Sequence, residues 1–195
     1  NNVGIAARYA QKSKFLNKIF IFDWDVHHGN GTQHSFYSDS SIYYSSAHQY
    51  PFYPGTGAEE ETGTGNGLGT TLNLPMSAYS EDDDYLSAVE NTLLPEIQRY
   101  KPDLIIISAG FDAHQNDPLA QIQLTTDCFG KMTELLMGAA DDVCDGRLLS
   151  MLEGGYDYDA LSDSVQLHMK TLLSSDPVDW YMLQQHIRNF TDRVI

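Results

Sequence analysis

The stretch DWDVHHGNGT at residues 23–32, preceded by the apolar run IFIF at 19–22, decides how the rest of the chain is interpreted. The apolar run predicts a buried β-strand over 19–24. Carboxylates and imidazoles that directly follow such a strand lie where the chain leaves the sheet. In open α/β sheets, ligands usually bind at that edge. The stretch therefore indicates both a sheet and a metal site.

Strands and helices alternate outward from this stretch. We expect helices over 3–16, 80–100, 125–144 and 158–173. Further strands are expected over 41–46, 71–74, 104–107 and 147–152. The alternation predicts an α/β fold with a doubly wound, mostly parallel sheet and helices on both faces.

Three of these segments carry more specific expectations. The strand over 71–74 should end at Pro75, and the strand over 147–152 should be buried. Residues 47–70, rich in Gly, Pro and Thr, should form a long loop, and such loops are often functional. Residues 176–195 form a polar and aromatic extension with no assigned role.

Composition narrows the classes of partner. The chain has 195 residues and a formal net charge of −16, which should repel nucleic acids and anionic membrane surfaces. No apolar run is long enough to cross a membrane, and no secretory signal is recognisable. Cys128 and Cys144 form no metal or disulfide motif and are expected to be small buried hydrophobic residues. A reducing compartment, the cytoplasm, is the expected location.

Polar residues that can bind a metal or take part in catalysis follow three of the predicted strands. Asp25 and His27 follow the first, Asp112 follows 104–107, and Tyr156 follows 147–152. In extended chain, residues two apart point the same way, so Asp25 and His27 should face one site. Asp112 alone would be expected to cap a helix, but a parallel sheet brings all three strand ends to one edge. Two carboxylates and one imidazole leave a position open, as in catalytic zinc sites.

Three separate motifs now carry a resemblance. Residues 23–32, the segment SAGFD at 108–112 and the segment LEGGY at 152–156 resemble the zinc-dependent histone deacetylase family, within the arginase-deacetylase fold. Their form is most similar to its class II and bacterial deacetylase-like branch. The resemblance runs in order along residues 1 to about 174.

The resemblance implies roles for these residues. One zinc ion would be held by Asp25, His27 and Asp112, and Tyr156 would be the catalytic phenol that donates a hydrogen bond to the developing oxyanion. Asp23 and Asn30 would form hydrogen bonds with the two imidazoles of a general base and so fix the orientation of those rings. Tyr53, Leu119 and Gly155 would line the substrate channel.

Two monovalent cation sites, for potassium or sodium, are also implied by the resemblance. The first would use the Asp23 carboxylate, the Ser46 hydroxyl and the backbone carbonyls of Asp23, Asp25, His27 and Ala47. The second, more weakly indicated, would use the carbonyls of Phe36, Asp39 and Ile42.

One departure from the family pattern stands out. Members of the family use a consecutive His-His pair, upstream of the first zinc ligand, as general base, and no such pair precedes Asp23. His27-His28 cannot serve, because His27 is needed for the metal. We therefore expect residues 1–175 to be the C-terminal part of a single deacetylase catalytic domain whose N-terminal part is missing. Exposed sheet edges would then favour association between copies.

Three functions stay open. The first is hydrolysis of an acetylated amine such as acetyl-lysine by a zinc-dependent parent enzyme, with the activity of this chain alone left open. The second is an acetylpolyamine amidohydrolase, which the acidic charge favours; Leu119, where a polyamine-selective relative has an acidic residue, argues against it. The third is a catalytically incomplete module that binds a metal or a partner. An arginase-like enzyme with two manganese ions is less well supported, because it needs more carboxylates than these strand ends supply.

Overall fold

The computed structural model describes residues 1–174, so the predicted extension over 176–195 lies outside the described residues. A five-stranded sheet, parallel throughout, forms its centre, with strand order β3-β2-β1-β4-β5. The strands are β1 (Ile19–Asp23), β2 (Ile42–Gln49), β3 (Thr71–Met76), β4 (Leu104–Ala109) and β5 (Leu148–Leu152).

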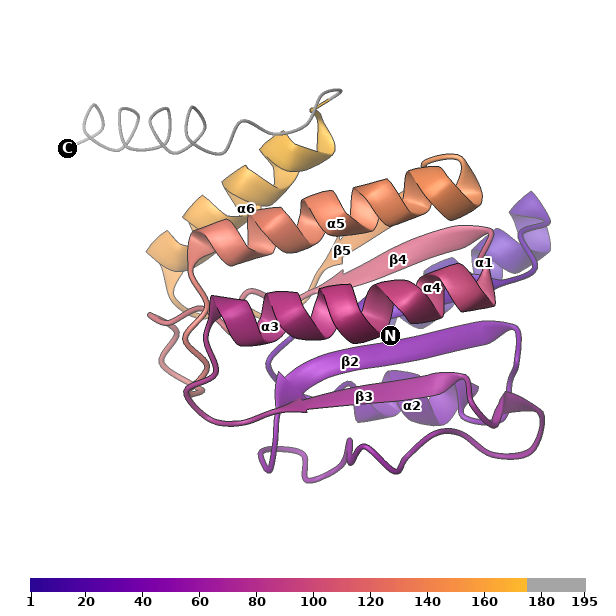
Figure 1. Cartoon of the computed structure of the whole chain (residues 1–195), viewed down its shortest axis with the longest axis horizontal. Helices are drawn as coiled ribbons and strands as arrows, with labels where there is room; N and C mark the ends of the chain where they lie inside the picture. Colours follow the sequence, from indigo (N-terminus) through magenta and orange to yellow (C-terminus); the bar gives the residue numbers. More distant parts are fainter. Residues whose placement is uncertain (175–195) are drawn as a thin grey trace.

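Helices cover both faces of the sheet, which confirms the predicted doubly wound α/β fold. Figure 1 shows α3, α4 and α5 in front of the sheet, and α1 and α2 behind it. The helical elements are α1 (Asn2–Lys14), α2 (Asn30–Phe36), η1 (Gly65–Gly67), α3 (Asp82–Ala88), η2 (Val89–Leu93), α4 (Leu94–Tyr100), α5 (Thr126–Cys144) and α6 (Tyr158–Leu172).

Alternate side chains of the central strands divide the core into two layers. Phe20 and Phe22 of β1 pack toward α3, α4 and α5, whereas Ile19 and Ile21 pack toward α1 and α2. All five residues of β1 are buried, as expected for a strand covered on both faces. Cys128 and Cys144 are both free and buried, as predicted.

The order of the strands places a functional edge. From β1 the chain moves outward to β2 and β3, then returns to pair β4 with the other side of β1. The carboxyl ends of β1 and β4 therefore meet where the winding direction reverses, and such switch points are where open α/β sheets bind ligands.

Two expectations about the strands need correction, and one helix was not expected. Strand β3 continues through Pro75 to Met76, because it lies at the edge of the described sheet, where a residue without an N–H is tolerated. Strand β5 is not buried: it is the opposite edge, and Leu152 is 60% exposed. The segment 30–36 forms helix α2 although Asn30-Gly31 is typical of a turn.

The helix predicted over 80–100 is confirmed as one continuous helical run from Asp82 to Tyr100, with two local differences. Glu81 and Asp84 form a capping box that starts it at Asp82, and it widens into a π-helical turn over Val89–Leu93 before Pro95. A proline has no N–H, and its ring would collide with the carbonyl four residues earlier, so a wider turn relieves that conflict. Among the described residues, no helix is long and apolar enough to span a membrane.

Candidate metal centre

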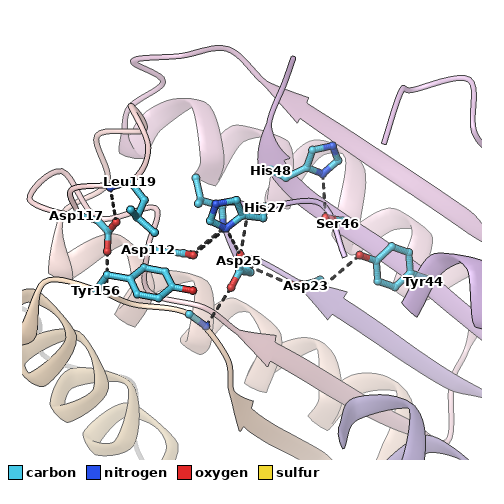
Figure 2. Close-up of polar contacts among 12 residues, drawn as sticks. Asp23, Asp25, His27, Tyr44, Ser46, His48, Asp112, Asp117, Leu119 and Tyr156 are labelled. Carbon is cyan, nitrogen blue, oxygen red and sulfur yellow. Dashed lines mark hydrogen bonds and ion pairs between the residues drawn. The ribbon is translucent and has the colours of Figure 1, made fainter. Parts of the chain in front are cut away.

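Asp25, His27 and Asp112 come together at the switch point. One ligand atom from each lies within 4.8 Å of the others. The Nδ1 atom of His27 is 3.1 Å from Asp25 Oδ1 and 3.1 Å from Asp112 Oδ2. Figure 2 shows the three side chains converging beyond the end of β1. The structure thus brings together the three residues that the sequence predicts as metal ligands.

The local geometry of Asp25 and His27 differs from the extended chain that was expected. Strand β1 ends at Asp23, and the following residues form a bend. The Oδ1 atom of Asp25 accepts the backbone N–H of His27 at 2.9 Å, which closes a short turn. The two side chains therefore face one point because of this turn, and not because of strand alternation.

Asp112 is held from a different direction. Its side chain is buried, and its Oδ1 atom accepts the backbone N–H of Val26 at 2.9 Å, so the second oxygen is left facing His27. It caps no helix, contrary to the role expected for this residue taken alone, because no described helix begins there. The bond to Val26 ties the ends of β1 and β4 together.

Two glycines allow the backbone to pass close to the carboxylates. A Cβ atom at Gly154 would overlap Asp112 Oδ2 and Asp25 Oδ2, and one at Gly110 would overlap Asp25. The backbone N–H of Gly154 also donates to Asp25 Oδ2 at 3.1 Å. The donor set, with this close packing behind it, fits a single small cation of the zinc type.

The electrostatics of the site favour positive charge between the carboxylates. Hydrogen bonds with Asp112 and then Asp25 raise the pKa of His27 to about 10. Burial raises the pKa of Asp112 to about 6, and burial also acts to raise the pKa of Asp25, but hydrogen bonds with His27 outweigh it and lower that pKa. A metal ion that binds here would compete with the proton on His27, because a ligating imidazole must be neutral.

Tyr156 lies beside the centre, after β5. In Figure 2 its ring lies beside Asp112 with the hydroxyl directed toward Asp25, yet the residue is 51% exposed. Burial, followed by the negative charges of Asp112 and Asp25, raises the pKa of its phenol, so the hydroxyl stays protonated and can donate. The preceding Gly155 has φ 140°, where a side chain would be strained, and its Cβ would also meet Leu161.

Asp23 and Ser46, predicted to share a cation site, are cross-strand partners in β1 and β2. Asp23 is 3% exposed, and its carboxylate accepts from the Tyr44 hydroxyl and the Asp25 N–H, both at 3.2 Å. The Ser46 hydroxyl is already 2.9 Å from His48 Nδ1. In the weaker second set, the carbonyls of Phe36 and Asp39 accept backbone N–H groups of Asp39 and Ile42.

Asn30, predicted to orient an imidazole with Asp23, is exposed at the start of α2. Asp23 faces a cavity of about 270 Å³ that Asp25, His27, Ser108 and Glu153 also line.

The predicted channel residues lie on different segments. Tyr53 is 75% exposed and meets the His27 ring edge-on at 6.2 Å between ring centroids. Sequence reasoning missed its neighbour Phe52, whose ring stacks on His27 at 5.6 Å. The only signal for Phe52 was its position next to Tyr53 in the segment PFYP, because nothing in a sequence says which of two adjacent aromatic residues faces a ligand.

Sequence reasoning also missed a buried polar cluster under the loop over 50–64. His28 bonds Thr56 Oγ1 at 2.7 Å and Gln33 Oε1 at 2.9 Å. His48 bonds the Gly57 carbonyl at 3.0 Å, and burial lowers the pKa of His48 to about 4. The two histidines therefore attach the loop that carries Phe52 and Tyr53 to the sheet.

These features define a class: an α/β protein with a candidate single-metal centre, built from two carboxylates and an imidazole, at the switch point of a parallel sheet. The model of the histone deacetylase domain matches residues 1–172. The chain therefore belongs to the histone deacetylase family, as its motifs predicted.

Relatives from several lineages agree. The chain is 47% identical over 175 residues to histone deacetylase 14, chloroplastic, of Arabidopsis thaliana, covering 90% of this chain and 41% of that protein. It is 42% identical over 156 residues to a probable deacetylase of Archaeoglobus fulgidus, covering 80% and 43%.

A solved structure shows the same fold. The histone deacetylase Clr3 superposes with a TM-score of 0.85 at 41% identity, over 91% of this chain and 31% of that one. The chain is also similar in sequence to the histone deacetylase clr3 of Schizosaccharomyces pombe. The chain spans less than half the length of these curated relatives.

Proposed function

We propose that the protein of which this chain forms a catalytic part is a zinc-dependent deacetylase that hydrolyses an acetylated amine of the acetyl-lysine type. The observation that carries the proposal is the convergence of Asp25, His27 and Asp112 within 4.8 Å at the switch point. Membership of the histone deacetylase family supports the reaction class. Asp25, His27 and Asp112 would hold the zinc ion, which would supply Lewis acidity for the acetamide carbonyl and for a bound water.

The chain's own residues account for the remaining steps that we assign to it. Tyr156 donates a hydrogen bond to the oxygen on which negative charge develops, a contribution of about 3 kcal/mol for comparable oxyanion donors. Phe52 and Tyr53, on one side of His27, offer aromatic surface to the aliphatic stem of the substrate. Leu119, 51% exposed, offers a second apolar surface.

Zinc binding tests the metal assignment directly. Calorimetric titration of zinc into the metal-free chain should show one site, and Asp112→Asn should weaken it by removing a charged ligand. Asp145→Asn, at an exposed residue that pairs with Arg147, removes the same charge and should leave zinc affinity unchanged. Equal affinity in the Asp112→Asn variant and in the wild type would refute the assignment.

Turnover tests the general base. A positioned base contributes typically 10²–10⁴-fold, and this sequence has no His-His pair apart from His27-His28. We therefore expect the purified 195-residue chain to bind zinc but deacetylate an acetyl-lysine peptide poorly. Robust turnover, with the intact mass verified, would contradict this expectation.

The alternatives separate on substrate and on partner. Acetylspermidine, assayed beside acetyl-lysine peptide on the full-length protein, tests the polyamine function that the net charge of −16 favours and Leu119 disfavours. If the domain is instead an interaction module, Asp112→Asn should leave partner binding intact.

Structural cations and location complete the proposal. We assign one potassium or sodium ion to Asp23 and Ser46, because a buried carboxylate is stabilised by a nearby cation. A melting temperature that rises with potassium more than with tetramethylammonium at equal ionic strength would support it. The cytoplasm stays the expected location, although two of the relatives are named chloroplastic.

A further inference from the structure

Asp117 has a buried carboxylate that joins two segments on the same side of the metal centre. The residue is 7% exposed. Its Oδ1 atom accepts the backbone N–H of Leu119 at 3.0 Å, and its Oδ2 atom accepts the backbone N–H of Tyr156 at 2.8 Å. Figure 2 shows Asp117 between these two residues, with both contacts drawn.

The second of these contacts crosses the fold. Leu119 lies two residues after Asp117, so the bond to Leu119 shapes only the local turn. Tyr156, in contrast, is 39 residues away and follows a different strand. A carboxylate that accepts backbone N–H groups makes a charge-assisted bond, which is stronger than a neutral one. Because Asp117 is buried, water competes poorly for either N–H.

Tyr156 needs such an anchor more than most aromatic residues. Half of its surface is exposed, so packing alone does not fix the ring, and it follows two glycines. The turn is attached before it by Gly154, which bonds Asp25 and Phe111, and after it by Asp157, which caps α6. The bond to Asp117 acts between these two points, at the Tyr156 backbone itself.

We propose that Asp117 is a positioning residue, which fixes Tyr156 and Leu119 relative to each other so that the phenol and the channel wall keep one geometry. This inference rests on the proposed function, in which Tyr156 contacts the reacting carbonyl oxygen and Leu119 contacts the substrate stem. Asp117 itself touches neither, and it acts through the two backbone N–H groups.

Amide hydrogen exchange, followed by NMR on the 195-residue chain without metal, tests the anchoring. Asp117→Asn keeps the shape but replaces one acceptor oxygen with an NH₂ group, so the Tyr156 and Leu119 amides should exchange at least tenfold faster. Asp157→Asn is the matched control: it removes a charge one residue after Tyr156 and keeps an N-cap side chain. Unchanged exchange at both amides in Asp117→Asn would overturn the proposal.

A double-mutant cycle tests the positioning. Acetohydroxamate, a small chelator with an oxyanion, is titrated into the zinc-loaded chain. We expect Asp117→Asn to weaken its binding about tenfold, as loss of one charge-assisted hydrogen bond does. Tyr156→Phe should weaken binding in the wild type but have little further effect in the Asp117→Asn background.

A purely structural role gives a different pattern. It would lower the melting temperature while the effect of Tyr156→Phe stays at full size in both backgrounds, and that result would overturn the proposal. If Asp117→Asn fails to fold, Asp117→Glu keeps the charge, displaces the carboxylate and is measured in the same way. If wild-type zinc binding is absent, the proposed function fails, whereas amide exchange still decides whether Asp117 holds the two segments.

Discussion

At the scale of single residues, small side chains decide whether the metal ligands can meet. Gly110 and Gly154 let the ends of β4 and β5 approach Asp25 and Asp112 more closely than any other residue would. The convergence of Asp25, His27 and Asp112 could be predicted from the sequence, because residue type and strand-end position agree. The glycine contacts could not, because they depend on which segments pack together.

Gly154→Ala should therefore reduce zinc affinity by about 10–100-fold, the range found when groups that support metal ligands are disturbed. The added methyl group would overlap Asp112 Oδ2 and Asp25 Oδ2 and push them apart. Calorimetric titration measures the loss. Gly138→Ala is the control, since a Cβ atom at this helical position meets nothing within 4 Å; equal affinities in the two variants would contradict the steric argument.

His168 makes stability depend on pH. It is 4% exposed, and its ring nitrogens lie 2.6 Å from Thr133 Oγ1 and 2.8 Å from Ser150 Oγ. Burial lowers the pKa of His168 from 6.5 to about 4. Below pH 6.5 the unfolded chain takes up a proton that the folded chain refuses, so the free energy of unfolding falls as pH drops toward 4, by about 3 kcal/mol.

Urea unfolding between pH 4 and pH 7 measures this dependence. His168→Gln should flatten it, because the variant has no proton to take up at this position. The same change at exposed His34 is the control. A His168→Gln variant with the wild-type slope would show that other groups, such as His48, account for the loss.

At the scale of elements, helix caps and breaks were only partly predictable. The sequence indicated a helix over 80–100, but the π-helical turn before Pro95 arises from how a proline ring is accommodated in a helix that must stay packed. Helix α2 was not predicted because Asn30-Gly31 favours a turn locally. The packing of Phe36 against the sheet and α1 stabilises the helix instead. Tertiary packing overrode local preference in both elements.

Helix α6 gives a prediction at this scale. Asp157 is its N-cap, and the carboxylate accepts the Ala160 N–H at 2.8 Å. Asp157→Ala should lower the free energy of unfolding by about 1 kcal/mol, because that N–H loses its partner, whereas Asp157→Asn should cost much less. Chemical denaturation of both variants measures the difference, and equal losses would show that charge and not capping is responsible.

At the scale of the whole molecule, the order of the parallel strands could not be predicted from any local sequence pattern. The sequence predicted strands and their alternation with helices, but the return of the chain from β3 to β4 beside β1 is a property of the assembled sheet. That return joins ligands from two distant segments. A metal bound at Asp25, His27 and Asp112 therefore links β1 to β4 and should stabilise the entire fold.

Zinc at one hundred times its dissociation constant should raise the free energy of unfolding by about 2.7 kcal/mol, because it binds the folded chain in preference to the unfolded chain. Differential scanning calorimetry with and without zinc measures this gain, and Asp112→Asn should remove it. Magnesium at the same concentration is the control, since it prefers six oxygen ligands. An equal gain from magnesium would indicate general screening of the acidic chain.

The separation of the candidate metal ligands along the chain also has a consequence for synthesis on the ribosome. His27 precedes Asp112 by 85 residues, so at about 5–20 residues per second the first two ligands emerge roughly 4–17 s before the third. During that interval the nascent chain offers one carboxylate and one imidazole, a weak chelator open to any cellular cation. A metal that needs all three of these residues can therefore be selected only late, after β4 has arrived beside β1.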